Sequence, residues 1–329
     1  MAPKSPSPWR ALAALVALAL APAPAHAAGA EWLGVESSAS GAVIVWSPQR
    51  LVRSAGDDEF EAVALGAGRI LDVAVDDDGS FAVLLAGEAD QPARVEFHPQ
   101  GRPTLVVEAT PDRIVAGGGG LVLLDEAGLR RLTWDGRPGP VIDVPTPCEG
   151  CVDRTSPDDL DLARDGTLRL TDTEINTCTS ADILEWQRVV TARPGADRAH
   201  ARTITVDPAD YAATWRIGAH GWLYGVSYAR RIVAVGARGA HPVTAIPTDG
   251  TWPDLQIAHN DRATVAAVGE TLWRVEGHHA RLLARTPSPP LDLALDPRSR
   301  PLALLERDGE IRLLRFERAR GWVTLHLPE

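Results

Sequence analysis

The chain has almost no lysine, few cysteines and no long apolar run beyond its first residues. Lys4 is the only lysine, so no phosphate-binding loop ending in Lys-Ser or Lys-Thr is present. Neither a Gly-x-Ser-x-Gly nucleophile elbow nor a His-Glu-x-x-His zinc helix occurs. These absences exclude the enzyme classes that depend on those motifs. The missing apolar run predicts no membrane span after residue 27.

The first 27 residues have the pattern of a secretory signal peptide. Lys4 and Arg10 precede an apolar run over residues 11–21, and Ala25-His26-Ala27 is a small-x-small cleavage site. We therefore expect residues 1–27 to be a signal peptide and residues 28–329 to form a single domain. The mature protein is expected to be exported, to the periplasm or the extracellular space.

The expected mature chain is strongly acidic. Residues 1–27 hold two of the 33 basic residues and none of the 44 acidic ones, so the remainder carries a net charge of −13. Such a surface repels nucleic acid and anionic lipid. The partners we expect are therefore proteins, cations or small molecules, and we expect the chain to be monomeric.

Seven tight-turn signals divide the chain at regular intervals. They lie at Gly41, Gly79, Gly119, Gly166, Gly221, Arg262 and Arg300, with spacings of 38, 40, 47, 55, 41 and 38 residues. Asp165-Gly166 is the strongest signal, because glycine accepts the positive φ that hairpin turns need. The spacing matches the four-strand blade period of about 40–50 residues. It predicts an all-β, seven-bladed β-propeller of four-stranded antiparallel blades, with six blades as the alternative.

The segments between the turns support this prediction. Alternating patterns such as residues 71–75 and 291–295 place Leu and Val on one face of the innermost strands. We expect the tryptophans to fill the gaps between blades. The outermost strands are predicted over residues 104–107, 141–144, 202–206, 243–246, 282–283 and 322–327. Since the last blade ends in its own outer strand, closure is predicted to occur by packing of the first and last blades.

Residues 157–176 resemble the NHL repeat. This segment has a Pro, an apolar strand, an Asp-Gly turn, a second apolar strand, and then Asp172-Thr173 and Asn176. Residues 291–314 match the repeat in part, and the other blades share only the strand rhythm. The resemblance implies a binding scaffold. It also implies, by analogy with lactonase-type propellers, the alternative of a metal-dependent hydrolase or lyase.

Unusual residues gather in loops that a propeller places on one face, over blades four to six. These are the loops that lead into each innermost strand and those that join the second strand to the third. The candidate ligand-binding residues there are Asp153, Arg154, Asp158, Asp172, Glu174, Asn176, Tyr211, Trp215, Trp252 and Asp254. Aromatic and arginine side chains commonly anchor interfaces. Our leading hypothesis is therefore an exported binding propeller that uses this face to hold a protein or small-molecule partner.

The three cysteines, Cys148, Cys151 and Cys178, fall in the same loops of blade four. An oxidising compartment favours a disulfide between them. We expect Cys178 to pair with Cys151, with Cys148 as the alternative partner. A Cys148–Cys151 bridge and a thiolate metal site are the competing interpretations.

A cation site at the channel mouth is the basis of the enzyme alternative. Following the family resemblance, its ligands would be Asp161, Asp172, Glu174 and Asn176, with Ca²⁺ as the possible cofactor. Asp72, Asp161 and Asp292 are also predicted to occupy equivalent innermost-strand positions, where they would form part of a ring. No general base or catalytic residue can be identified from the sequence.

Overall fold

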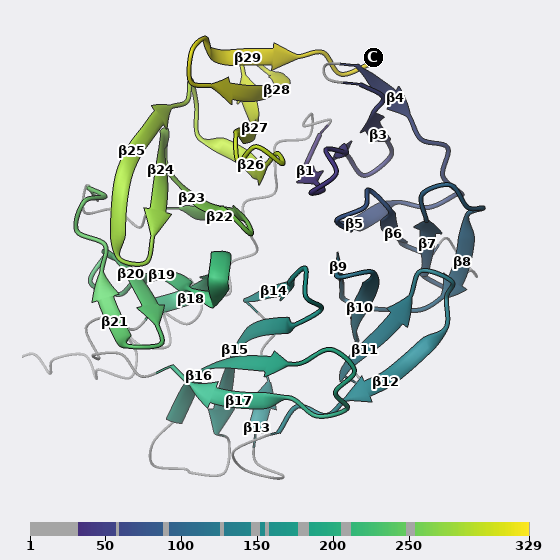
Figure 1. Ribbon diagram of the computed structural model, residues 1–329, viewed down its shortest axis with the longest axis horizontal. Helices are drawn as coiled ribbons and strands as arrows, with labels where there is room; N and C mark the ends of the chain where they lie inside the picture. The colour runs from purple at the N-terminus through teal and green to yellow at the C-terminus, as the bar shows by residue number, and fades with distance from the viewer. Residues whose placement is uncertain are drawn as a thin grey trace, which may run out of the picture.

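Seven antiparallel blades surround a central channel (Figure 1). The computed structural model describes residues 32–56, 59–87, 92–125, 128–145, 152–154, 158–176, 184–204, 212–247 and 254–328. The predicted seven-bladed propeller is confirmed. The expected signal peptide lies outside the described residues and stays a prediction.

The strands follow one another from the channel to the rim in every blade. Blades one to three contain β1 (Gly34–Ser37), β2 (Val43–Trp46), β3 (Leu51–Ser54), β4 (Phe60–Ala62); β5 (Ile70–Val75), β6 (Phe81–Leu85), β7 (Arg94–His98), β8 (Leu105–Glu108); β9 (Arg113–Gly117), β10 (Gly120–Asp125), β11 (Gly128–Thr133) and β12 (Pro138–Ile142). Blade four contains β13 (Val152–Arg154), β14 (Asp159–Leu162), β15 (Leu168–Asn176), β16 (Leu184–Ala192) and β17 (His200–Thr203). Blades five to seven contain β18 (Ala212–Ile217), β19 (Leu223–Ser227), β20 (Ile232–Gly236), β21 (Gly239–Pro242); β22 (Leu255–Asn260), β23 (Ala263–Val268), β24 (Thr271–Glu276), β25 (His279–Arg285); β26 (Pro290–Leu295), β27 (Pro301–Arg307), β28 (Glu310–Glu317) and β29 (Gly321–Leu325).

All seven predicted turns join the first strand of a blade to its second. In blade two the Gly79 N–H donates to the Asp76 carbonyl at 2.9 Å, and Gly79 has φ of 89°. In blade four Gly166 donates to Ala163 at 2.7 Å and has φ of 76°. A side chain on either glycine would be strained in this left-handed conformation. These turns end each innermost strand on one face of the ring, which we name the turn face; the opposite face, where those strands begin, is the loop face.

Apolar side chains fill the gap between every two adjacent blades. The described residues form seven buried clusters, each shared by neighbouring blades. Six of the clusters include a tryptophan, as in the pair of Phe97 with Trp134, whose ring centroids lie 6.1 Å apart. The expectation that tryptophans pack between blades is therefore confirmed.

Among the described strands, the ring closes where blade one meets blade seven, without exchange of a strand between them. Trp32, Val35 and Val45 of the first blade pack against Leu302 and Leu304 of the last. Figure 1 shows β1 beside β26 and the C-terminus beside β4. The predicted closure by packing of complete blades is confirmed.

Blades four and five depart from the sequence prediction in their details. In blade four, β15 and β16 have nine residues each and extend past β14, so the short β13 pairs with the extension of β15. In blade five, the outer strand is β21, and the prediction of a strand at residues 243–246 is wrong. There the Val243 N–H bonds Ile232 and the chain turns, because Val243 and Ile246 insert into the core between blades five and six.

Candidate functional site: the axial channel

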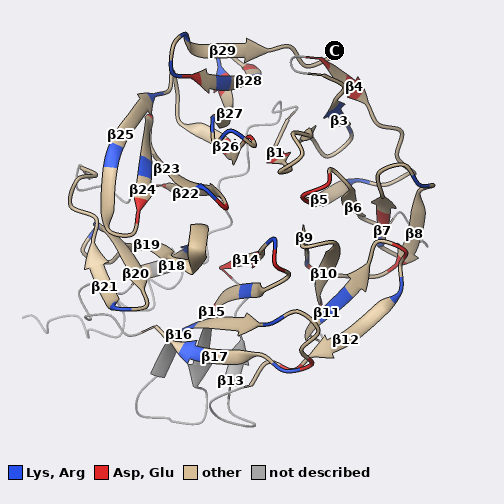
Figure 2. Ribbon diagram, viewed as in Figure 1, with Lys and Arg blue, Asp and Glu red and all other residues tan. Residues whose placement is uncertain are grey.

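The axis of the ring is a cavity of about 1240 Å³. Residues of all seven blades line it, mostly from the innermost strands and their turns. Figure 2 shows acidic and basic residues on the inner elements around this opening. The wall includes nine carboxylates and five arginines, so the cavity is acidic but contains both charges.

Four carboxylates, Glu36, Asp72, Asp159 and Asp292, form what we name the carboxylate ring. Three of them join blades. The Oδ2 atom of Asp72 accepts the Ile114 N–H at 2.9 Å, that of Asp159 accepts Ile217 at 2.6 Å, and that of Asp292 accepts Val35 at 2.8 Å.

The same three aspartates also bind within their own strands. Each Oδ1 accepts the N–H of the following residue, at 2.9–3.0 Å. Each carboxylate is thus fixed by two backbone donors and held against the channel wall. The third member of this set is Asp159, so the sequence prediction of Asp161 was wrong by two residues. The reason is that β14 begins at Asp159, so the position facing the next blade falls earlier than the hydrophobic pattern indicates.

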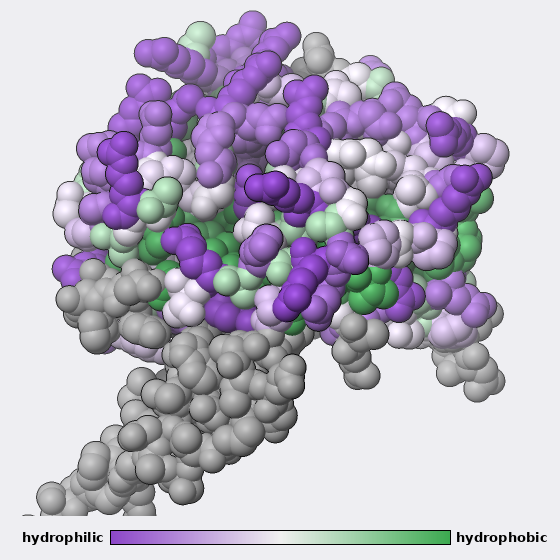
Figure 3. All heavy atoms as spheres, turned by 60° about the horizontal axis from the view of Figure 1, so that its bottom comes forward, coloured by the Kyte–Doolittle hydropathy of each residue, from purple (hydrophilic) through white to green (hydrophobic). Residues whose placement is uncertain are grey.

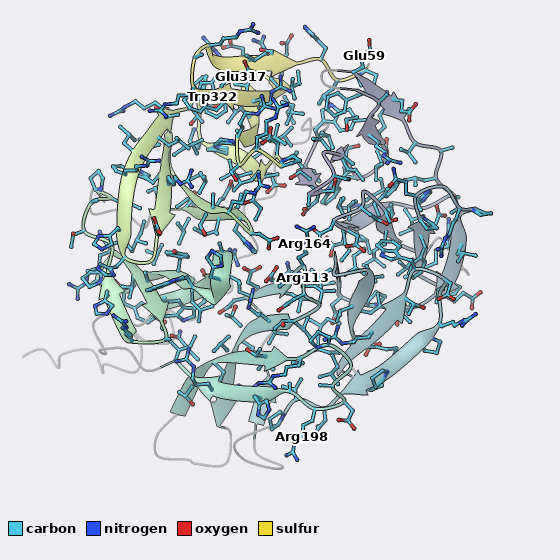
Figure 4. All side chains as sticks on the ribbon, in the orientation of Figure 1. Glu59, Arg113, Arg164, Arg198, Glu317 and Trp322 are labelled. Atoms are coloured by element: carbon cyan, nitrogen blue, oxygen red, sulfur yellow. The ribbon has the colours of Figure 1, made fainter. Side chains whose placement is uncertain are left out.

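Glu36 and Arg113 differ from these aspartates. Within the described part of the chain, neither side chain makes a hydrogen bond or a close ion pair. The charge of Arg113 acts on Glu36, Asp72 and Asp159. Figure 4 shows Arg113 at the centre of the molecule, near the opening. The cavity wall therefore includes a carboxyl group, Glu36, and a guanidinium group, Arg113, that the described residues leave without hydrogen-bond partners.

Burial raises the pKa of the carboxyl groups in the ring. Protein surrounds Glu36 in the channel, although its side chain is exposed to the channel space. Loss of bulk solvation, followed by the charges of Asp292 and Asp72, raises the pKa of Glu36 from 4.5 to about 8. Burial likewise raises the pKa of Asp292 to about 6 and raises the pKa values of Asp72 and Asp159. At neutral pH Glu36 is therefore protonated.

A second charged group lies further along the channel. Asp161 of blade four accepts a bond from Arg169 Nη1 at 3.1 Å, and His259 Nε2 of blade six lies 3.6 Å from its other oxygen. Carboxylate and imidazole thus face each other from two different blades.

Arg164 spans the channel at the turn face. Its guanidinium lies 3.9 Å from Asp77 of blade two and 3.7 Å from Asp261 of blade six. In the view of Figure 4, Arg164 and Arg113 both lie over the central opening. The Arg164 side chain thus bridges turns on different sides of the ring.

Three of the ten candidates chosen from sequence form a network between blades four and five. Asp172 binds Arg188 through both oxygens, at 3.0 and 2.6 Å, in a buried ion pair. Trp215 is 0% exposed, and its Nε1 donates to Gln187 at 2.8 Å. Asp158 accepts the Trp215 backbone N–H at 3.3 Å, and burial raises its pKa to about 6. We assign these side chains to packing within and between blades instead of ligand contact.

The other candidates are not brought together by the described structure. Asp254 is exposed next to β22. The positions outside the described residues, or with only backbone described, are Asp153, Arg154, Glu174, Asn176, Tyr211 and Trp252. Their role in binding stays a prediction.

The cysteines and the metal site also stay predictions. Cys148, Cys151 and Cys178 lie outside the described residues. Among the residues that are described, no group of three or more His, Cys, Asp or Glu side chains is arranged to hold a metal ion. Of the four proposed cation ligands, Asp161 and Asp172 are each paired with an arginine.

Sequence reasoning missed Glu36 and Arg113. Both lie on short innermost strands, and no local motif marks them. The available signal was their place at the start of a blade, next to positions already predicted to face the axis.

Nowhere in the described part of the chain is there a helix of the length and apolarity that a bilayer crossing requires. The hydrophilic character of the surface agrees with the acidic composition. Figure 3 shows mostly hydrophilic side chains with small apolar areas between them on the side that it brings forward.

Comparisons with known proteins support the fold and leave the family open. No protein-family model matches the sequence, and no curated protein matches it either. The NHL resemblance therefore has no support beyond the β-propeller fold itself.

Solved propellers are similar in structure at low sequence identity. YCF48 bound to a D1 peptide has a TM-score of 0.57 at 14% identity, over 87% of this chain and 92% of that one. The β-propeller domain of the Trilobed protease from Pyrococcus furiosus, described as having an open velcro topology, has a TM-score of 0.58 at 9% identity, over 90% and 95%.

PorZ is a larger similar protein. This surface component of the type-IX secretion system of Porphyromonas gingivalis has a TM-score of 0.59 at 11% identity. The match covers 91% of this chain but only 38% of the PorZ chain. At these identities the comparisons show a β-propeller fold.

Proposed function

We propose that this protein is an exported binding propeller that takes a positively charged group of a protein or small-molecule ligand into its axial channel. The observation that carries the proposal is the cavity of about 1240 Å³ in which Glu36 and Arg113 have unused hydrogen-bonding capacity. In the cavity wall as a whole, nine carboxylates outnumber five arginines. A ligand cation would satisfy this excess.

The carboxylates suit this role because they are already oriented. Backbone N–H groups of two strands fix Asp72, Asp159 and Asp292, so little conformational freedom is lost when a cation arrives. Arg113 reduces the net negative charge of the carboxylate ring. It would repel a ligand whose positive charge lay next to the Arg113 guanidinium. The ring thus provides both attraction and selectivity.

The loop face is the side from which we expect the ligand to enter. Arg164 crosses the turn face, whereas Asp72, Asp159 and Asp292 lie within the first three residues of their innermost strands. The loop face also contains the ends of β12, β15, β17 and β21, which flank the loops chosen from sequence. The structure of YCF48 with a bound peptide supports a peptide as one kind of ligand.

Calorimetry with two blocked peptides tests the proposal. Acetyl-Gly-Lys-Gly-amide should bind, whereas acetyl-Gly-Gln-Gly-amide, which has no charge, should not. Asp292→Asn should weaken binding of the lysine peptide roughly tenfold or more, since a hydrogen bond to a charged group contributes about 1.5–3 kcal/mol. Binding should also strengthen as the pH rises toward 8, where Glu36 loses its proton.

Glu310→Gln is the matched control, because Glu310 is an exposed acid on the rim strand β28. It should leave binding unchanged. Equal affinity for the two peptides, or an equal loss from Glu310→Gln and Asp292→Asn, would refute the channel as a cation site.

A further inference from the structure

The outer edge of blade two differs from the other outer edges of the ring. In β8, Leu105 and Val106 are 38% and 56% exposed, so two consecutive large apolar side chains face solvent. Edge strands are normally protected by proline, charge, irregular register or shortness, because an open edge can pair with another chain. In the described residues, β8 contains no proline and its register with β7 is regular, and its one charged residue is Glu108 at its end.

The other outer strands differ from β8. β12 contains two prolines, and β21 ends in Pro242. β25 has a register shift and two arginines, and β4 has only three residues. β17 includes His200 and Arg202, while the apolar side chains of β29 are at least partly buried. Among the described residues, β8 is thus the outer strand on which two consecutive large apolar side chains are exposed.

The register of β8 shows which backbone groups are free. Ala109 N–H donates to the Ala93 carbonyl, so the pair 93 with 109 is hydrogen-bonded. Hydrogen-bonded pairs alternate along an antiparallel ladder, which makes Val95 with Val107 the next such pair. The N–H and C=O groups of Val106 and Glu108 therefore point away from β7, toward an incoming strand. The backbone N of Pro103 is on the side of the strand that faces β7. The N–H that proline lacks is therefore not one of the groups of the free edge.

The charges at the two ends of this edge are complementary to each other. Arg102 lies before β8 and Glu108 ends it, and both are exposed. In an antiparallel pair of two β8 strands centred on Leu105, Arg102 of one copy lies opposite Glu108 of the other. Thr104 then lies opposite Val106. All four positions have the same parity, so their side chains share one face of the combined sheet. An isologous pair therefore places unlike charges opposite each other at both ends.

We propose that β8 pairs with β8 of a second copy of this chain, forming a homodimer by continuation of the blade-two sheet. The dimer has two-fold symmetry and buries Leu105 and Val106. It replaces the monomer expected from the sequence and is independent of ligand binding in the channel.

Sedimentation equilibrium of the purified chain over a wide range of concentration tests this proposal. The wild-type protein should show a concentration-dependent dimer, and Val106→Arg should make it monomeric. Val141→Arg is the matched control, because Val141 is equally exposed, at 52%, on the proline-containing edge β12 of the neighbouring blade. It should leave the dimer intact.

A charge exchange tests the register. Glu108→Arg and Arg102→Glu should each weaken the dimer, because each puts like charges opposite one another. The double variant should restore it. A monomer at every concentration, as expected if β8 binds a different protein or nothing, would overturn the proposal. A dimer unaffected by Val106→Arg, or not restored by the double exchange, would overturn it equally.

Discussion

At the scale of single residues, the carboxyl groups of this chain fall into two kinds. Asp172 is buried against Arg188, which occupies both of its oxygens, so its charge is compensated inside the protein. Glu36 has no such partner among the described residues, and its surroundings raise its pKa to about 8. The first kind is used inside a blade, since Asp172 and Arg188 lie on the paired strands β15 and β16, whereas the second leaves interaction capacity facing the channel. We therefore base the proposed function on Glu36 and not on Asp172.

Trp215 should behave as a core residue. Its side chain is fully buried between blades four and five, and its indole N–H donates to Gln187. Trp215→Ala should lower the free energy of unfolding by about 3–5 kcal/mol, because the truncation leaves a cavity and an unpaired amide. Chemical denaturation measures this loss.

Tyr228→Ala provides the comparison, since Tyr228 is 52% exposed on the surface of the same blade. It should change the free energy of unfolding by no more than about 0.5 kcal/mol. If Trp215→Ala lowered the free energy of unfolding as little as Tyr228→Ala, Trp215 would again be a candidate contact residue.

The sequence identifies which residues are apolar and periodic, but not which polar residues meet across blades. Asp72 and Asp292 could be predicted to face the axis because each lies inside a clear alternating strand. Asp159 and Arg113 could not, since each is the first residue of its strand, where the pattern has only begun. Trp215 was taken for a contact residue because an aromatic beside a long loop has the same local sequence whether it points inward or outward.

At the scale of elements, the positions of the glycine turns are easier to predict from the sequence than the ends of the strands. Every predicted turn is present, and five of the seven contain a glycine with positive φ, a conformation that restricts the residue type strongly. The outer strand of blade five was misplaced because residues 239–242 contain Gly and Pro, which are unfavourable in strands, whereas Val243 and Ile246 are apolar for packing reasons. Outer strands are thus the least predictable elements of a blade.

The long strands β15 and β16 extend beyond the innermost strand of blade four, so this is the blade that we expect a disulfide to stabilise. Their ends flank Cys178, and β13 follows closely after Cys151. Because β13 pairs with the end of β15, the backbone beside the two cysteines is held side by side. We predict a Cys151–Cys178 disulfide, which would stabilise the fold by about 3–4 kcal/mol in the chain-entropy model. Peptide mapping without reduction identifies the pairing.

Two results of that mapping would argue against the prediction. A bridge between Cys148 and Cys151 with Cys178 free would contradict it, and so would three free thiols in protein secreted into an oxidising compartment. A Cys148–Cys178 bridge would support the loop arrangement but correct the choice of partner.

At the scale of the whole molecule, the ring brings ionisable side chains from different blades together in one channel. No single blade contains the site: Glu36, Asp72, Arg113, Asp159 and Asp292 come from five different blades. Closure by Asp292 on Val35 makes the last blade part of both the fold and the channel. Stability and channel protonation are therefore expected to depend on each other.

The dependence of stability on channel protonation has a definite direction. The pKa of Glu36 is higher in the folded protein, at about 8, than its ordinary value of 4.5. Between these values the folded state binds more protons than the unfolded state, so the Glu36 contribution to stability decreases as the pH rises. Asp292 and Asp158, with pKa values raised to about 6, act in the same direction below that pH. His98 acts in the opposite direction, because burial lowers its pKa.

Glu36→Gln isolates the effect of the channel from that of His98. Glutamine resembles the protonated acid, so the variant and the wild type should melt at similar temperatures near about pH 5. As the pH rises through 8, wild-type Glu36 becomes charged inside the ring, and the variant should become the more stable of the two. Calorimetric melting across this range gives the difference directly. A difference that does not change with pH would mean that Glu36 keeps an ordinary pKa, and that the carboxylate ring holds no proton for a ligand to displace.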